Sequence, residues 1–198
     1  MTPRSDVSEQ RRMQIMEAAM KVFARQGIDG ARIDDIVEEA GLSKGAFYWY
    51  FESKNELVTA ILEGLFESEL IDLENTGGQG TSASERMTTF IRRVCTDLQE
   101  SAEILPIMFE FYALAFRDPA VWKSMEKFFR RYVQALAPVI EQGIESGEFR
   151  PLDVQEAAIA VGAVLEGTLL LWAYDPETVK LERHLESGLR LLLKGIMK

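Results

Sequence analysis

The sequence predicts an all-α protein of about nine helices, in which an N-terminal helix-turn-helix precedes a larger helical domain. Apolar residues recur at three- and four-residue spacings along most of the 198 residues. No run alternates polar and apolar residues as a strand hairpin does, and glycine, proline and capping residues fall between the periodic segments. We therefore expect two domains, residues 1–55 and residues 56–198.

The first three predicted helices are separated by glycine-containing turns. The first spans about residues 8–26, and Gly27 lies where a glycine would close its last turn. The second carries an apolar stripe and ends at Gly41, and Ser43 can cap the third, which is barely two turns long. Two short helices that meet at such a turn are typical of a helix-turn-helix.

Capping residues mark the next helices. Ser53–Glu56 is a capping box for a helix that continues to about residue 74, and Ser82–Glu85 is one for a helix that reaches about residue 101. The stretch 75–82 between these two helices is rich in Gly, Ser and Thr, and we expect it to be a mobile connection. A sixth helix is expected over residues 102–117.

Three further helices complete the prediction. Asp118 and Pro119 supply a cap and a first-turn proline for a long seventh helix that ends near Gly147. Asp153 starts the eighth helix, which ends near residue 174, and the ninth is expected over residues 177–197.

The eighth helix raises the question of a membrane span. Residues 157–174 carry a single charge, Glu166, over 18 positions. They lack basic flanks and include several small residues, and a core or subunit interface also requires a helix that is apolar all round. We favour that second interpretation and expect no membrane association.

The net charge of −10 is unevenly distributed. Residues 1–55 contain 8 Lys and Arg against 9 Asp and Glu, whereas residues 56–198 contain 14 against 23. DNA repels an acidic protein as a whole, but only charges within a Debye length of about 8–10 Å act strongly on the phosphates. A nearly neutral head with a basic face is therefore compatible with DNA binding.

The terminus and the cysteine content favour a cytoplasmic protein. Residues 1–12 are polar and charged, so no secretory signal is expected. The single cysteine, Cys95, fits a reducing compartment. Because it lies in an apolar run, we interpret it as a buried small hydrophobe and not as a redox sensor.

The third helix carries the groups that point to DNA. Gly45 leaves room for this helix to enter a major groove, and Lys44 can reach a phosphate or a guanine edge. Tyr48, Trp49 and Tyr50 are consecutive and point in three directions, so at least one must face solvent or a ligand. We favour DNA contact over a buried aromatic cluster for these three side chains.

Neighbouring residues complete the predicted DNA-binding set. Phe47 and Phe51 are expected in the core, whereas Lys54, in the first turn of the fourth helix, is expected to bind phosphate. The predicted DNA-binding residues are Arg32, Ser43, Lys44, Gly45, Tyr48, Trp49, Tyr50 and Lys54.

The chain resembles the TetR family of transcriptional regulators over about residues 11–60. The resemblance is carried by residue type and spacing together, at Ala18-Ala19, Phe23, Gly27, Ile36, residues 40–45, residues 47–51, Ser53-Lys54 and Leu57. It implies a homodimer whose two recognition helices enter successive major grooves of a palindromic operator.

Two positions depart from the family's pattern. Such proteins often have Thr at the cap of the second helix and Arg two residues later, where this chain has Arg32 and Asp34. Arg32 can restore a phosphate contact from the cap. Asp34 and Asp35 stabilise the helix N-terminus through its dipole, but near DNA they lower affinity.

The resemblance also implies an effector cavity enclosed by the fourth to eighth helices. We expect an apolar or amphipathic effector anchored by Glu166 or, less favoured, by Glu110; a hydrogen-bonded role for Glu166 at a subunit interface stays open. The expected ligand-binding residues are Phe90, Phe109, Tyr112, Phe116, Trp122, Phe129, Glu166 and Trp172. The last two helices are expected to form a four-helix bundle in the dimer, with an apolar stripe of Leu185, Leu189, Leu192 and Ile196.

The sequence gives little support for an enzyme. His184 lies among charged residues, and there is no zinc-binding cluster, phosphate loop or nucleophile elbow, so no metal or cofactor is expected. The expected function is a ligand-responsive repressor that a small effector releases from its operator, with activation as an open variant. The alternatives are a helical small-molecule binding protein without operator recognition, and a small all-α enzyme that uses Glu110 or Glu166.

Overall fold

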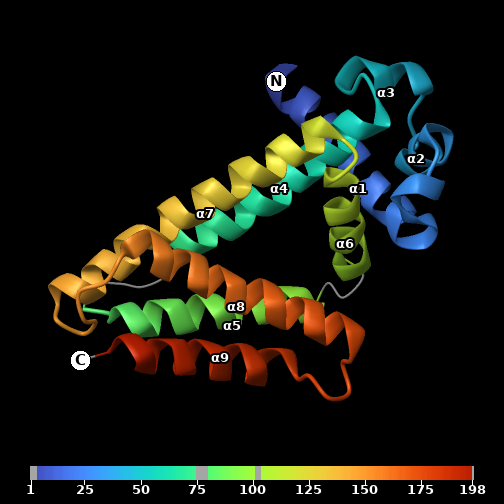
Figure 1. Ribbon diagram of the computed structural model, residues 1–198. Helices are drawn as coiled ribbons and strands as arrows, with labels where there is room; N and C mark the ends of the chain where they lie inside the picture. The colour runs from blue at the N-terminus through green and yellow to red at the C-terminus, as the bar shows by residue number, and fades with distance from the viewer. Residues whose placement is uncertain (1–3, 75–79, 101–103, 198) are drawn as a thin grey trace. The chain divides into compact units, whose positions relative to one another are not determined.

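The computed structural model describes residues 4–74, 80–100 and 104–197, which contain nine helices and no strand (Figure 1). This confirms the all-α prediction. The helices are α1 (Arg4–Gly30), α2 (Ile33–Ala40), α3 (Lys44–Tyr50), α4 (Lys54–Glu74), α5 (Ala83–Glu100), α6 (Ile104–Ala115), α7 (Pro119–Glu145), α8 (Val154–Tyr174) and α9 (Leu181–Ile196).

These helices form two compact units. The first comprises residues 1–65 and 101–126, and the second comprises residues 66–100 and 127–198, so α4 and α7 contribute to both. Helix α6 belongs to the first unit because it packs against α1. The compact units therefore differ from the two domains predicted from the motifs, residues 1–55 and 56–198. That division stays a prediction about which part of the chain binds DNA and which binds the effector.

Capping residues begin most helices as expected. The side chain of Ser43 accepts a hydrogen bond from Ala46 N at 3.2 Å, and that of Asp153 accepts one from Glu156 N at 2.9 Å. The Asp118 carboxylate accepts one from Ala120 N at 2.8 Å. These bonds satisfy amide groups that have no partner within their own helix.

Two capping predictions need correction. The Glu56 amide donates to Ser53 Oγ at 3.1 Å, but the Glu56 carboxylate accepts from Glu52 N at 2.5 Å and not from Ser53 N. Helix α9 begins at Leu181 and not at residue 177, because Asp175 accepts from Thr178 N at 3.0 Å and holds a turn there. Residues 75–79 of the expected mobile connection lie outside the described residues.

Helix α1 changes direction at Gly27. This residue has φ 73° and ψ 165°, a conformation that favours glycine, so regular helix geometry stops where the sequence predicted. A Cβ at this position would lie 3.0 Å from Glu110 Oε1, so the absent side chain also makes room for a carboxylate.

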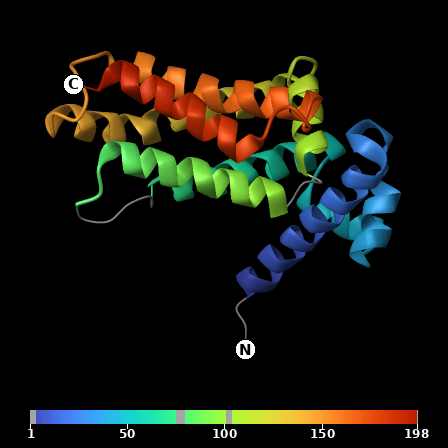
Figure 2. The same cartoon turned by 90° about the horizontal axis from the view of Figure 1, so that it is seen from below.

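In the second unit, α5, α8 and α9 run close together (Figures 1 and 2). Helix α9 buries one i, i+4 stripe, which consists of Leu181, Leu185, Leu189 and Leu193. Of the stripe predicted for the dimer, Leu185 and Leu189 are buried within the chain, whereas Leu192 and Ile196 are only half-buried, and its role in a dimer stays a prediction.

Helix α8 is long and apolar enough to cross a membrane, judged by length and composition among the described residues. Apolar helices of soluble proteins pass the same test. In the single chain only 28% of its most apolar window is buried, on a face formed by Ala158, Val161, Leu165 and Leu169. The rest of this apolar helix remains available for a further contact.

Cys95 is 2% exposed, which confirms its prediction as a buried hydrophobe. Burial, together with the carboxylates of Glu182 and Glu186, raises the pKa of its thiol from 9.0 to about 11. Because the thiolate is the reactive species, we expect negligible alkylation of the folded protein at about pH 8 and rapid alkylation in denaturant. Time-resolved mass spectrometry with iodoacetamide checks this, and rapid labelling of the native chain would contradict it.

Candidate functional site

The short helix α3 is anchored by its phenylalanines. Phe47 and Phe51 are 0% and 1% exposed, and their ring centroids lie 5.8 Å apart. The Arg12 guanidinium covers the Phe51 ring at 5.3 Å, a cation–π contact from α1. The prediction that both residues are core residues is confirmed.

The opposite face of α3 is open to solvent. Trp49 is 81% exposed and Tyr48 is 51% exposed, whereas Tyr50 is half-buried. Exposed tryptophans are costly unless they meet a partner, because apolar surface stays in contact with water. The expectation that this run cannot be wholly buried is confirmed, and contact with DNA stays a prediction.

Gly45 is not needed by the fold. A Cβ built on it would meet only Ser43 Oγ, at 3.8 Å, which is ordinary van der Waals contact. Its lack of a side chain therefore leaves space on the outside of α3, where a partner would lie. This agrees with the predicted close approach to a groove.

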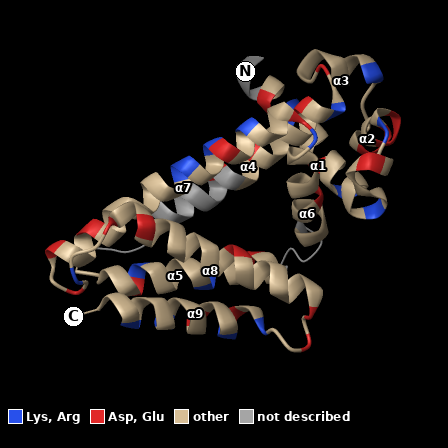
Figure 3. Ribbon diagram, in the orientation of Figure 1, with Lys and Arg blue, Asp and Glu red and all other residues tan. Residues whose placement is uncertain are grey.

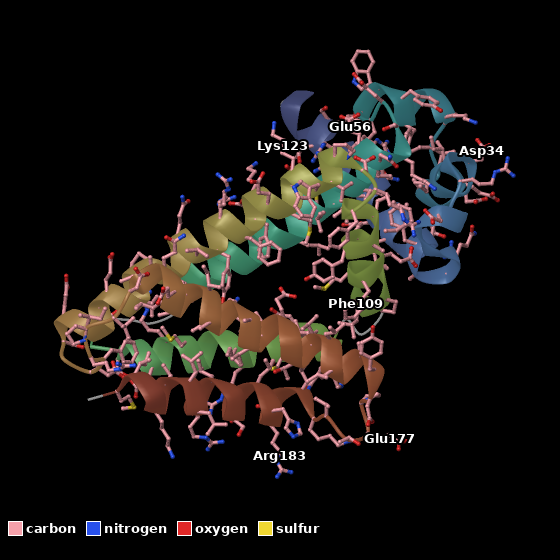
Figure 4. All side chains as sticks on the ribbon, in the orientation of Figure 1. Asp34, Glu56, Phe109, Lys123, Glu177 and Arg183 are labelled. Carbon is pink, nitrogen blue, oxygen red and sulfur yellow. The ribbon has the colours of Figure 1, made fainter. Side chains whose placement is uncertain are left out.

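Lys44 forms an ion pair with Asp34, and this pair links the start of α3 to α2. Lys44 Nζ lies 2.8 Å from Asp34 Oδ1, and both side chains are about half exposed. The charged residues of α2 itself are all acidic (Figure 3), and Asp34 points outward from this helix (Figure 4). Asp34 thus shields the cation that was predicted to contact DNA.

The hydrogen bond and the charge of Lys44 lower the pKa of Asp34 from its ordinary 3.8, and Asp34 raises the pKa of Lys44. A carboxyl with a depressed pKa stabilises the fold only while it is ionised. The stabilisation from the ion pair is therefore complete above the ordinary pKa of 3.8 and is lost as the pH falls through the lowered pKa of Asp34 in the folded protein.

We expect Asp34→Asn to strengthen DNA binding. Freeing Lys44 should steepen the slope of log K against log salt by about one per half-site, because one more phosphate counterion is released. Fluorescence anisotropy across a salt series measures the slope, and Glu38→Gln, an exposed charge removed from the same helix, is the control. An unchanged slope in Asp34→Asn with an intact fold would contradict a DNA contact by Lys44.

Arg32 lies exposed at the N-cap of α2. Its backbone amide donates to Asp35 Oδ2 at 3.1 Å, which leaves the guanidinium in solvent beside the Asp34–Lys44 pair. Asp35 therefore caps the helix, whereas Arg32 provides the cation at this end of α2 as the sequence predicted.

Lys54 lies in the first turn of α4 as predicted, but its ammonium is directed into the chain. Its ammonium donates to the carbonyls of Ile28 at 2.7 Å, Ala31 at 2.9 Å and Asp29 at 3.3 Å. An ammonium has three N–H donors, and all three are directed at the end of α1. In this conformation Lys54 fixes the junction of α1 and α2 and has no donor left for a phosphate.

Glu110 also serves this junction. Glu110 lies on α6, and its Oε2 accepts a hydrogen bond at 2.5 Å from the backbone amide of Ile28, the residue after Gly27. Glu110 therefore has a structural role at this junction, and the less favoured role of Glu110 as an effector anchor stays a prediction. Together Glu110 and Lys54 hold one short segment, residues 27–31, from two other helices.

A separate apolar pocket of about 340 Å³ lies within the second unit, between α7 and α8. Its lining residues are Phe128, Phe129, Tyr132, Val133, Ile159, Gly162, Ala163, Leu165 and Glu166. Of the predicted ligand-binding residues, it brings together Phe129 and Glu166.

The other predicted ligand-binding residues lie elsewhere. Phe90 is buried in the second unit at 3% exposure, and Trp172 is half-buried on α8 outside the pocket lining. Phe109 and Tyr112 are in ring contact on α6 (Figure 4), and Phe116 and Trp122 are exposed with ring centroids 5.6 Å apart.

Sequence reasoning missed Tyr132 and Gly162 as pocket residues. A Cβ on Gly162 would lie 3.1 Å from Tyr132 Cε1, so the glycine allows the Tyr132 ring to pack against α8. A glycine within an apolar helix, next to an aromatic-rich helix, was the available signal.

No group of His, Cys, Asp and Glu suited to a metal ion occurs among the described residues. His184 Nδ1 accepts a hydrogen bond from Lys180 N at 2.8 Å, so this histidine caps α9 locally.

A short exposed helix that carries aromatic and cationic side chains, held after a glycine turn by two buried phenylalanines, defines a helix-turn-helix DNA-binding protein. Residues 15–61 match the bacterial regulatory proteins of the tetR family, and residues 83–194 match the C-terminal region of BetI-type transcriptional repressors. The chain belongs to the TetR family of transcriptional regulators.

Relatives match nearly the whole chain. The HTH-type transcriptional regulator TtgR of Pseudomonas putida is 30% identical over 203 residues, covering 93% of this chain and 92% of TtgR. Two solved structures share the fold. The complex of SmeT, a repressor of Stenotrophomonas maltophilia, with triclosan has a TM-score of 0.82 and 22% sequence identity. The match covers 96% of this chain and 92% of the SmeT chain. The complex of the transcriptional regulator FadR from Bacillus subtilis with stearoyl-CoA has a TM-score of 0.80 and 23% sequence identity. It covers 93% of this chain and 98% of the FadR chain.

Proposed function

We propose that this TetR-family repressor binds a palindromic operator as a homodimer in the cytoplasm and is released by a small apolar or amphipathic effector. Residues 1–55 would read the DNA, and residues 56–198 would bind the effector and form the dimer. The observation that carries the proposal is the exposed face of α3. Trp49 and Tyr48 are exposed on this face, whereas Phe47 is buried and anchors the helix.

The exposed surface of α8 and α9 supports dimerisation. The leucines that α9 buries lie inside the chain, but Leu170, Leu171, Tyr174 and Leu191 are 42%, 59%, 79% and 69% exposed. Covering such side chains with a second copy removes apolar area from water. We therefore assign the interface to these outward residues instead of to the predicted stripe that contains Leu185 and Leu189.

Release by an effector follows if the effector prefers one separation of the two recognition helices. On B-DNA the recognition helices of a dimer must lie about 34–36 Å apart to enter successive major grooves. A ligand that binds more tightly to a different separation lowers operator affinity by that difference in binding free energy. The complexes of SmeT with triclosan and of FadR with stearoyl-CoA support a bound small molecule in this fold.

Selection of oligonucleotides from a random pool by the full chain tests the proposal. A palindromic consensus, bound by two chains in analytical ultracentrifugation, is the expected result. Enrichment of no sequence, with a salt-independent background, would instead favour the helical small-molecule binding protein. That outcome would agree with the net charge of −10 and with the acidic Asp34 beside Lys44.

A further inference from the structure

We propose that a groove between α5 and α9 binds a small organic phosphate monoester, a ligand separate from the effector of the proposed function. The groove has a volume of about 310 Å³, and all of its lining residues belong to the second compact unit. Helices α5 and α9 lie side by side there (Figures 1 and 2). The groove shares no residue with the pocket between α7 and α8, so the inference does not depend on an effector in that pocket.

The lining of this groove has an excess of positive charge. Arg92 on α5 and Arg190 and Lys194 on α9 border it, against one carboxylate, that of Glu186. Residues 56–198 as a whole contain 14 basic and 23 acidic side chains. The groove therefore reverses the charge of the domain around it, and this favours a negatively charged ligand.

Two of these cations have no partner within the described residues. Arg190 and Lys194 are exposed, and their side chains form no ion pair or hydrogen bond with any described residue. They lie four positions apart on one face of α9, where like charges repel each other. A ligand with two negative charges removes this repulsion, and a phosphate monoester carries about −1.5 to −2 charges at neutral pH.

Arg92 adds hydrogen-bond donors from the opposite helix. Its Nε donates to Glu186 Oε1 at 2.6 Å, and this ion pair joins α5 to α9. A guanidinium also has four N–H donors on its two terminal nitrogens, and these can reach a phosphate oxygen while the ion pair persists. Guanidinium groups bind phosphate through two parallel hydrogen bonds, whereas an ammonium acts as a point charge. A phosphate in the groove would therefore be held from both helices.

The carboxylates of Glu186 and Glu148 contact groove residues, and both are already engaged. Glu186 pairs with Arg92. Glu148 accepts hydrogen bonds from Ala83 N at 2.9 Å, from Ser84 N at 3.3 Å and from Ser84 Oγ, so it caps the start of α5. The charge that remains uncompensated in the groove is therefore positive.

The groove also offers apolar surface for the organic part of the ligand. Leu193 is 6% exposed and Met197 is 46% exposed, and both lie beside the cations on α9. An apolar substituent removes this surface from water, and the flexible Met side chain adapts to its shape. The volume is at the lower end of ligand pockets, which suits one or two fused rings beside a phosphate group.

The first experiment compares four probes by isothermal titration with the full chain, at about pH 7.5 in a phosphate-free buffer of low ionic strength. The probes are naphthyl phosphate, the monoanion naphthoate, uncharged naphthol and inorganic phosphate. We expect the ester to bind about tenfold or more tightly than each of the others, because only the ester combines a doubly charged head with an apolar group. Equal affinity for the ester and naphthol, or for the ester and inorganic phosphate, would overturn the proposal.

The double variant Arg190→Gln/Lys194→Gln locates the bound ester. It should weaken naphthyl phosphate about tenfold or more and leave naphthol within about threefold. Arg183→Gln is the matched control, because Arg183 is an exposed cation of α9 that lies two turns earlier, outside the groove lining (Figure 4). It should keep the affinity for the ester within about twofold. Equal affinities in the double variant and the control would show that the ester binds elsewhere and would overturn the site.

The phosphate of a lipid headgroup is the other source of this chemistry. Sedimentation with vesicles that contain phosphatidic acid, compared with vesicles of phosphatidylcholine alone, distinguishes it from a soluble ester. We expect the chain to stay in the supernatant in both cases, because its net charge of −10 opposes contact with an anionic membrane. Sedimentation with phosphatidic acid that the double variant abolishes, without binding of naphthyl phosphate, would contradict the soluble ligand.

Discussion

Replacing Trp49 with alanine is expected to weaken operator binding by about 2–6 kcal/mol in the dimer, which corresponds to about 1–3 kcal/mol for each half-site. The indole is 81% exposed, so its truncation removes little packing within the chain. We therefore expect the melting temperature to change by less than about 2 °C. Anisotropy titration of the selected operator and calorimetry of the free protein measure the two quantities.

Trp122→Ala is the matched control for this experiment. Trp122 is a tryptophan of the same unit and is 51% exposed, but it lies at the start of α7 and contacts Phe116. Its removal should leave operator affinity within about twofold in the absence of effector, because it contributes nothing to the face of α3. Equal losses in both variants would indicate a general effect on folding and would remove Trp49 from the DNA interface.

Lys54→Met is expected to destabilise the protein by about 2–3 kcal/mol, because it removes a charged donor from three carbonyls at the end of α1. For a chain of this length the melting temperature should fall by roughly 4–12 °C. The salt dependence of operator binding, measured well below that temperature, should keep its slope, since Lys54 has no donor free for a phosphate.

Lys44→Met should show the reverse pattern. Lys44 is about half exposed and pairs only with Asp34 among the contacts of the described residues, so stability should hardly change. In the Asp34→Asn background, where Lys44 is free to contact a phosphate, Lys44→Met should lower the slope of log K against log salt by about one per half-site. If instead Lys54→Met flattened the slope and left the melting temperature unchanged, Lys54 would be a phosphate ligand that turns away from α1 when DNA binds.

Helix boundaries and the character of α3 were predictable because both depend on neighbours in sequence. Ser43, Asp118 and Asp153 cap helices that begin at the next residue, and a cap needs only the amides of that first turn. Three consecutive aromatic positions cannot share one face of a helix, so the exposure of at least one of Tyr48, Trp49 and Tyr50 also followed from local geometry.

The partners of long charged side chains were not predictable. Lys54 reaches carbonyls more than twenty residues earlier in the chain, and Glu110 reaches the amide of Ile28, which lies 82 positions away. Helix propensity and periodicity carry no information on such pairs, because they form only when α1, α4 and α6 meet. The division of the predicted stripe into buried Leu185 and Leu189 and half-buried Leu192 and Ile196 has the same origin, since the buried face of α9 depends on its neighbours α5 and α8.

The sequence by itself determined the class of this protein: its helices, its helix-turn-helix and the exposed aromatic face of α3 all follow from spacing and capping within a few residues. Only the tertiary structure decided that Lys54 fixes the end of α1, that Asp34 shields Lys44, and that Glu166 meets the rings of α7 in one pocket. The physical reason is range, since local backbone geometry is set by adjacent residues, whereas the environment of a charge depends on whichever helices pack around it.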